Sequence, residues 1–246
     1  MTLFPLFPFF KDKSFKWSKT YDKFQDYPIV KEIYARFPSR TLCRADIVKL
    51  VEDNDILLSL IAAMIWGGIS TGGITGDNFT KLLKISDNRL EEIVIKANQY
   101  VSNGEIKKAF IFLETEGKIS GVGHSFHTKI LFFLGQAIPH ILSKPLIFDR
   151  WTKNAFCVFL YQTGQKALLN EFYLKFTDEK AEIKQGKLPD AYEVYVKSMN
   201  SWATQLYVKP SKLEEFVFGD DRRINRQKNN PRVELLNILV EIFNKN

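Results

Sequence analysis

Cysteine and histidine are both scarce in this chain of 246 residues, which has two cysteines and three histidines. The pair Cys43 and Cys157 excludes a multi-disulfide scaffold, a four-cysteine zinc site and a four-cysteine iron–sulfur cluster. No acidic residue lies at metal-ligand spacing from His124, His127 or His140, so we predict no metal site. So few cysteines fit a reducing compartment, and we expect an intracellular, cytoplasmic protein.

Long apolar segments are also missing. The run over residues 3–10 is interrupted by two prolines and lacks both a basic region before it and a small-residue cleavage site after it, unlike a signal peptide. Residues 56–74 are apolar but include four glycines, and their helix-compatible part is roughly 11 residues, against the ~20 that a membrane span needs. We therefore predict a buried core helix there and no membrane partner.

Positive charge and aromatic residues are abundant. Lys and Arg total 35 against 28 Asp and Glu, a formal charge of +7, and Phe, Tyr and Trp number 21, 9 and 4. The charge favours a polyanionic partner such as nucleic acid, although charge alone does not identify one. The hydrophobic fraction of 45% is typical of globular proteins and supplies one large core or two small lobes.

Apolar periodicity predicts a mainly α protein. Helical patterns cover residues 44–51, 56–66, 77–83, 87–101, 105–116, 152–161, 190–206 and 233–243. Residues 171–177 are the single modest strand candidate, and residues 1–43, rich in Phe and Pro, are expected to be irregular. Asp55 is positioned to cap the helix that follows it.

The segment 118–125, KISGVGHS, lies between two apolar-periodic helices. Gly121 and Gly123 flank a β-branched valine, a pattern that makes a tight turn and lets the backbone approach another surface closely. The second helix begins near Gly123, so its free N–H groups and the positive end of its dipole suit a phosphate. The alternative is a plain helix–helix turn with no ligand.

Two residues after the turn carry potential chemistry. Lys129 is the one charged residue between Lys118 and Lys144, in an apolar helix that should desolvate it and lower its pKa, as a nucleophilic amine requires. It shares a helix face with Ser125, although many helical lysines simply extend to the surface. Asp149 ends an apolar stretch ahead of the next helix, and its alternative role is an ordinary N-cap.

This order of hairpin, helix, lysine, loop and aspartate resembles the helix-hairpin-helix DNA glycosylase superfamily, most closely the 8-oxoguanine DNA glycosylase type. The resemblance covers residues 105–152, with the helix-hairpin-helix motif at about 105–136. It implies helical lobes around a cleft, with residues 1–246 forming a single compact catalytic unit. It further implies a DNA-associated protein that binds double-stranded DNA, which we expect to be a monomer.

The resemblance also implies roles for individual residues. Lys129 would attack C1′ of the damaged nucleotide and form a Schiff base, and Asp149 would activate the lysine or stabilise positive charge on the sugar. Amides of Gly121, Gly123 and Ser125 would bind phosphate, and carbonyls of the same turn would hold a monovalent cation, with no other cofactor. Stacking candidates for the flipped base are Trp66 and Trp202, followed by Trp151, Tyr192 and Phe216, each of which is also a plausible core residue.

The sequence departs from the family pattern at one position. Eukaryotic-type enzymes carry the catalytic lysine two residues after the second hairpin glycine, where this chain has Ser125. Lys129 follows one helical turn later on the same face, from which its long side chain reaches the same pocket. Adenine glycosylases have serine there, but their four-cysteine cluster cannot be built from Cys43 and Cys157.

Two alternative functions use fewer of these features. A non-catalytic helix-hairpin-helix protein would bind DNA through the hairpin and the basic surface without needing Lys129 or Asp149. A helical scaffold for protein partners would need neither, and the hairpin would then be only a turn. Retention on DNA separates the scaffold from the other two, and a reducible covalent adduct separates the enzyme from the simple binder.

Overall fold

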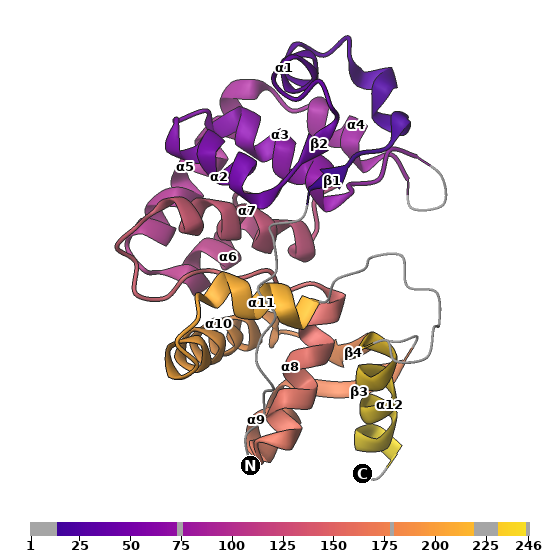
Figure 1. Cartoon of the computed structure of the whole chain (residues 1–246), viewed down its shortest axis with the longest axis vertical. Coiled ribbons are helices and arrows are strands. Elements are labelled where there is room, and N and C mark those ends of the chain that lie inside the picture. Colours follow the sequence, from indigo (N-terminus) through magenta and orange to yellow (C-terminus); the bar gives the residue numbers. More distant parts are fainter. Residues whose placement is uncertain (1–13, 73–75, 178–179, 219–230, 245–246) are drawn as a thin grey trace.

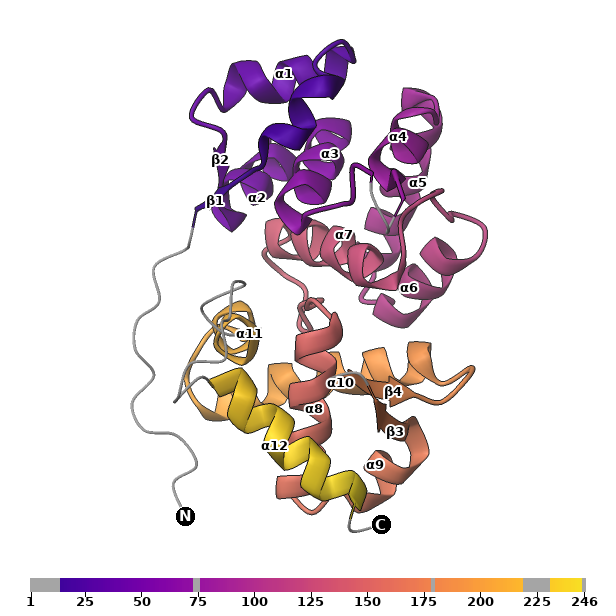
Figure 2. The same ribbon diagram turned by 90° about the vertical axis from the view of Figure 1, so that its right-hand side faces the viewer.

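The computed structural model describes residues 14–72, 76–177, 180–218 and 231–244. They form two mainly helical lobes, one above the other in Figure 1, joined by the connection between α7 and α8. The predicted mainly α class is confirmed. In Figure 2, α7 runs along the lower border of the upper lobe, with α8 directly beneath it.

The N-terminal lobe runs from β1 to α7. Its elements are β1 (Phe15–Lys16), the 3-10 helix η1 (Lys19–Phe24), α1 (Pro28–Arg36), β2 (Thr41–Leu42), α2 (Arg44–Glu52), α3 (Ile56–Gly67), α4 (Asn78–Leu83), α5 (Asp87–Ser102), α6 (Ile106–Glu114) and α7 (His124–Ala137). Strands β1 and β2 pair antiparallel over two residues each. Helix α3 is apolar on nearly every side and is buried at the centre, packed against α1, α2, α5 and α7.

The C-terminal lobe surrounds α8. Its elements are α8 (Arg150–Gln162), α9 (Lys166–Phe172), β3 (Tyr173–Thr177), β4 (Lys180–Ile183), α10 (Leu188–Gln205), α11 (Pro210–Phe218) and α12 (Pro231–Asn244). Helix α8 packs against α9, α11, α12 and β4, and β3 pairs antiparallel with β4. Within the described ranges, no helix combines the length and apolar character needed to cross a membrane.

Two local expectations were wrong. Of the segment 1–43, residues 1–13 lie outside the described part, but the rest contains η1 and the regular helix α1. Pro28 is the first residue of α1, where the missing N–H costs no hydrogen bond, so it begins a helix instead of breaking one. Asp55 precedes α3 but makes no side-chain cap, because its carboxylate pairs with Arg36 at 2.5 Å.

Candidate active site

The turn between α6 and α7 has the geometry that its glycines suggest. Gly121 adopts a φ of +81°, and a Cβ there would lie 2.7 Å from the carbonyl oxygen of Asn78, so the backbone of the turn presses against the start of α4. Gly123 has an ordinary φ of −103° and open space around it. Across the turn, Nδ1 of the buried His127 lies 2.7 Å from Glu114, which joins α7 to α6.

Several backbone N–H groups of this turn have no acceptor within the described protein. In the part of the chain that the structure describes, the N–H groups of Gly121, Gly123 and Ser125 donate to no protein acceptor. The next two amides, those of Phe126 and His127, both donate to the carbonyl of Gly123. The three unused donors therefore belong to the hairpin and the first turn of α7, where the helix dipole is positive.

Lys129 is buried and turns back along α7. Only 5% of it is exposed, and its Nζ donates to Ser125 Oγ at 2.9 Å and to the Ser125 carbonyl at 3.2 Å. The ammonium also lies 4.9 Å from the centre of the Phe126 ring. The Nζ atom therefore lies beside Ser125, although the lysine itself is one helical turn later in the sequence.

The end of α3 limits the space around Lys129. A Cβ added to Gly67 would lie 2.7 Å from Phe126 and 3.0 Å from Cδ of Lys129. The backbone of α3 therefore passes directly over the lysine side chain. A glycine 62 positions earlier in the chain (129 − 67) thus sets the room available to it.

Asp149 is the N-cap of α8. Its Oδ1 accepts hydrogen bonds from the backbone N–H groups of Trp151 at 2.9 Å and Thr152 at 3.2 Å, while Thr152 Oγ1 accepts from the Asp149 N–H. These bonds confirm the capping role that the sequence left open. All the capping bonds use one carboxylate oxygen, so the cap leaves the second oxygen available for another role.

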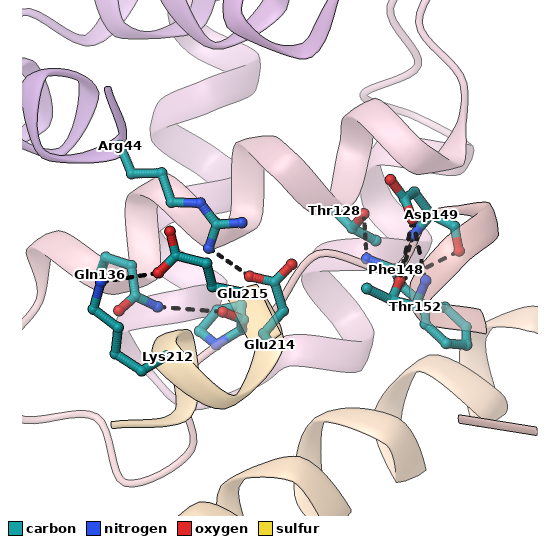
Figure 3. Close-up of polar contacts among 10 residues, drawn as sticks. Arg44, Thr128, Gln136, Phe148, Asp149, Thr152, Lys212, Glu214 and Glu215 are labelled. Atoms are coloured by element: carbon teal, nitrogen blue, oxygen red, sulfur yellow. Dashed lines mark hydrogen bonds and ion pairs between the residues drawn. The ribbon is translucent and has the colours of Figure 1, made fainter. Parts of the chain in front are cut away.

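One hydrogen bond places Asp149 next to the helix that carries Lys129. The N–H of Phe148 donates to Thr128 Oγ1 at 3.0 Å, and both groups are buried. Figure 3 shows Thr128, Phe148 and Asp149 together, with the cap of α8 directly beyond. Lys129 and Asp149, each one residue away from this bond, therefore come from different lobes, and both lie near the border between them.

A second lysine lies in the same region. Lys153 is one turn after Asp149 on α8, is only 6% exposed, and its Nζ lies 3.0 Å from Nε2 of His124, the first residue of α7. Burial first, then the charge of Lys180, lowers the pKa of Lys153 to about 8, with Lys129 acting in the same direction and Asp149 opposing. Burial and the charge of Lys153 lower the pKa of His124 to about 4, so the imidazole is neutral at pH 7.

A buried ion pair connects the lobes elsewhere. Arg44, at the start of α2, lies 2.5 Å from Glu214 of α11, and Glu214 is fully buried (Figure 3). The guanidinium also covers the rings of Trp66 and Phe132 at 5.4 and 4.9 Å. Burial raises the pKa of Glu214 in spite of the nearby arginine, and its Oε1 has no hydrogen-bond partner among the described residues.

The aromatic residues predicted for a base pocket lie in varied places. Trp66 is 5% exposed and packs edge-on against Phe133, so it belongs to the core in this structure. Trp202 is half-buried against Phe159. Tyr192 is fully buried and Trp151 is half-buried, while the side chain of Phe216 lies outside the described residues. The described rings of this set therefore pack against different neighbours, and their role in a base pocket stays a prediction.

Sequence reasoning missed Lys153 and the role of His124. Both residues were visible, and the spacing of four between Asp149 and Lys153 places them on one face of α8. Lys153 and His124 are each other's partners and lie 29 residues apart on different helices, a relation that no local pattern reports.

Among the described residues no cluster of His, Cys, Asp and Glu fits a metal ion.

Comparison with known proteins finds a family whose model matches most of the chain. The family described as "Putative 8-oxoguanine DNA glycosylase OGG-like protein" matches residues 13–218, which include the hairpin and every residue of the candidate site. No curated protein and no solved structure shows a significant match to the chain.

Proposed function

The chain belongs to this OGG-like family of DNA glycosylases, and from that premise we propose that it excises 8-oxoguanine from double-stranded DNA and cleaves the resulting abasic site through a Schiff base on Lys129. The carrying observation is the position of that amine, which is 5% exposed and lies 2.9 Å from Ser125 Oγ at the first turn of the hairpin helix. The proposal treats the chain as one catalytic unit, and one cluster of buried residues that extends through both described lobes supports this.

Lys129 supplies the nucleophile of this reaction. Its neutral Nζ donates its lone pair to form a bond with C1′ while the bond from C1′ to the base breaks. The base leaves with the electron pair of that broken bond and takes up a proton. Loss of a proton from the new secondary amine and opening of the sugar ring give the Schiff base. Removal of a C2′ proton then expels the 3′ phosphate by β-elimination.

Asp149 supplies negative charge at the opposite side of the same border. A sugar that loses its base develops positive charge at C1′, and a fixed carboxylate stabilises that charge without reorganising. The capping bonds of Oδ1 hold the carboxylate in place, and Thr128 binds the preceding residue to α7. The cap and the catalytic role are therefore compatible, since the cap is what orients the group.

The hairpin supplies the groups that bind the DNA backbone. The unused N–H donors of Gly121, Gly123 and Ser125 suit a backbone phosphate, and the net charge of +7 favours the duplex in general. The logarithm of the binding constant should fall linearly with that of the salt concentration, by about 0.9 per phosphate neutralised. A slope near zero, or no retention on DNA at low salt, would leave the helical scaffold as the better explanation.

Covalent trapping tests the enzyme directly. Incubation with duplex containing 8-oxoguanine opposite cytosine, in the presence of borohydride, should reduce the Schiff base to a stable protein–DNA adduct. Lys129→Gln should abolish the adduct while leaving DNA binding intact. Lys144→Gln is the matched control, since its Nζ donates to carbonyls at the far end of α7, those of Gly135 and Ile138.

Each result separates the candidate functions. An adduct that survives Lys129→Gln identifies another lysine as the nucleophile. DNA binding without an adduct on 8-oxoguanine, on an abasic site or on other lesions favours the non-catalytic binder, which the hairpin alone can support.

A further inference from the structure

Consecutive residues of the hairpin helix hold two buried lysines that come from different helices. Ser125 binds Nζ of Lys129, which is on the same helix, and His124 binds Nζ of Lys153, which comes from α8 in the other lobe. Both lysines are at least nine-tenths buried. The proposed reaction uses only the first of them and leaves the second without a role.

The position of Lys153 is strongly fixed. Its own carbonyl accepts a hydrogen bond from the buried Tyr173 hydroxyl at 2.8 Å, and the next residue, Asn154, accepts one from the N–H of Ala181 at 2.8 Å. These contacts join α8 to β3 and β4, and they leave the lysine side chain directed at His124. The helix therefore cannot easily turn the amine out to solvent.

The charges around Lys153 are unbalanced. Lys129 on α7 and Lys180 on β4 repel its ammonium, while Asp149 at the start of α8 attracts it from beyond ion-pair distance. His124 is uncharged at neutral pH, and the nearby carboxylate from α6, Glu114, acts on that histidine. Among the residues that the structure describes, no acidic group lies within 4 Å of the Lys153 amine. Two ammonium groups in so dry a place disfavour each other.

The hydrogen-bond partners distinguish the two amines. A neutral imidazole whose Nε2 faces an ammonium can only accept, so His124 favours the proton on Lys153. The hydroxyl of Ser125 either accepts or donates, and after rotation it can donate to the lone pair of an uncharged Lys129. The hydrogen bonds therefore favour the proton on Lys153, whereas the Ser125 hydroxyl accommodates Lys129 in either state.

We propose that Lys153, held by His124, is a positioning residue whose fixed positive charge keeps Lys129 in its neutral, nucleophilic form. This role rests on the proposed function only for its use in catalysis, because the coupling of the two amines is a property of the free protein. The coupling is reciprocal: if a charged Lys129 disfavours a proton on Lys153, a charged Lys153 disfavours one on Lys129 to the same degree. The two lysines therefore titrate as a pair.

A direct test needs no DNA. In protein labelled with ¹³C-lysine, the Cε signals of Lys129 and Lys153 report protonation and are assigned by their loss in Lys129→Gln and Lys153→Met. Lys153→Met keeps the length of the side chain and removes the charge, and it should raise the midpoint of the Lys129 titration by about 1 pH unit. Lys144→Met, the matched control, should leave that midpoint unchanged.

Two outcomes would overturn the proposal. The first is a Lys129 midpoint that stays constant or falls in Lys153→Met. The second applies if that variant does not fold: in the parent protein, the signals of both lysines should show two titration steps, and a single independent step for each would exclude the coupling.

The catalytic consequence is measured separately. In single-turnover trapping, Lys153→Met should move the alkaline rise of the rate to higher pH, which makes the adduct form about tenfold more slowly at pH 7 and at nearly the parental rate above pH 9. A rate that is lower by the same factor at every pH would show a merely structural role and overturn the proposal. If the parent protein forms no adduct at all, the proposed function fails while the titration still decides the coupling.

Discussion

Positive charge is buried at two places at the border between the lobes, and the two places differ in the charge of the group that faces it. Arg44 faces a carboxylate, Glu214, at 2.5 Å, whereas Lys153 faces the neutral imidazole of His124 at 3.0 Å with further lysines nearby. The first arrangement is nearly balanced and joins α2 to α11. The second stays unbalanced, and it lies next to Asp149 and Lys129. Burial therefore does not distinguish structural from functional charge here, whereas the presence of a counter-charge does.

The largest effect is expected at Asp149, next to the unbalanced Lys153. Asp149→Asn keeps the shape and the helix cap, because asparagine is as good an N-cap, but it removes the negative charge. Base release in single-turnover excision should fall by several hundredfold, about 4 kcal/mol in the barrier, while DNA affinity changes only a few-fold. Excision at the parental rate would show that Asp149 is only a helix cap. The Lys153 and Arg44 places would then no longer differ in function.

Breaking the balanced place should cost stability instead of activity. Arg44→Met leaves Glu214 buried without its cation, and urea denaturation should show a loss of about 3 kcal/mol or more. The double variant Arg44→Met/Glu214→Leu should recover most of that loss, because both charges are gone. A single variant within about 0.5 kcal/mol of the parent would show that the bridge is not a structural ion pair.

Removing the charge of Lys153 should raise the stability of the protein instead of lowering it. Because the pKa of Lys153 is lowered to about 8 in the fold, the folded state binds fewer protons than the unfolded chain between pH 8 and 10.5, so this group's contribution to stability rises with pH. Lys153→Met should therefore stabilise the protein by about 1–3 kcal/mol at pH 7, and the gain should shrink towards pH 10.5. A destabilisation comparable to that of Arg44→Met would contradict the distinction between the two places.

The smallest effects concern the turn that holds both lysines. Gly121→Ala requires a positive φ and meets the Asn78 carbonyl, so it should cost about 1–2 kcal/mol and weaken DNA binding. Gly123→Ala has an ordinary φ and free space, and thermal unfolding should place it within about 0.5 kcal/mol of the parent. Equal costs for the two variants would show that the turn does not depend on the left-handed conformation.

Much of the fold could be predicted because its helices bury one continuous apolar face. The patterns at residues 87–101 and 105–116 correspond to α5 and α6. Each predicted end lies within two residues of the observed end. The short helices α9 and α11 were missed, although α2 and α4, which are about as short, were predicted. Strand β3 was predicted within two residues of its start, but its partner β4, which is four residues long, was not predicted.

The site was predicted only as far as a linear motif extends. Lys129 and Asp149 follow from the order of hairpin, helix and loop, and the structure shows how both are held. Lys153 and Gly67 join the site through packing between helices, at separations of 29 residues from His124 and 62 from Lys129. Trp66 illustrates the reverse error: an aromatic residue of the right kind is occupied by the core.

The hydrogen bond between Thr128 and Phe148 has a mechanical consequence. It ties the connection between the lobes to α7 at a point one residue from Lys129 and one residue from Asp149. If the lobes rotate to admit a duplex, a pivot at this bond gives large displacements at their outer edges and small ones near the axis. The groups near this pivot would then keep their spacing while the outer surfaces of the two lobes move apart.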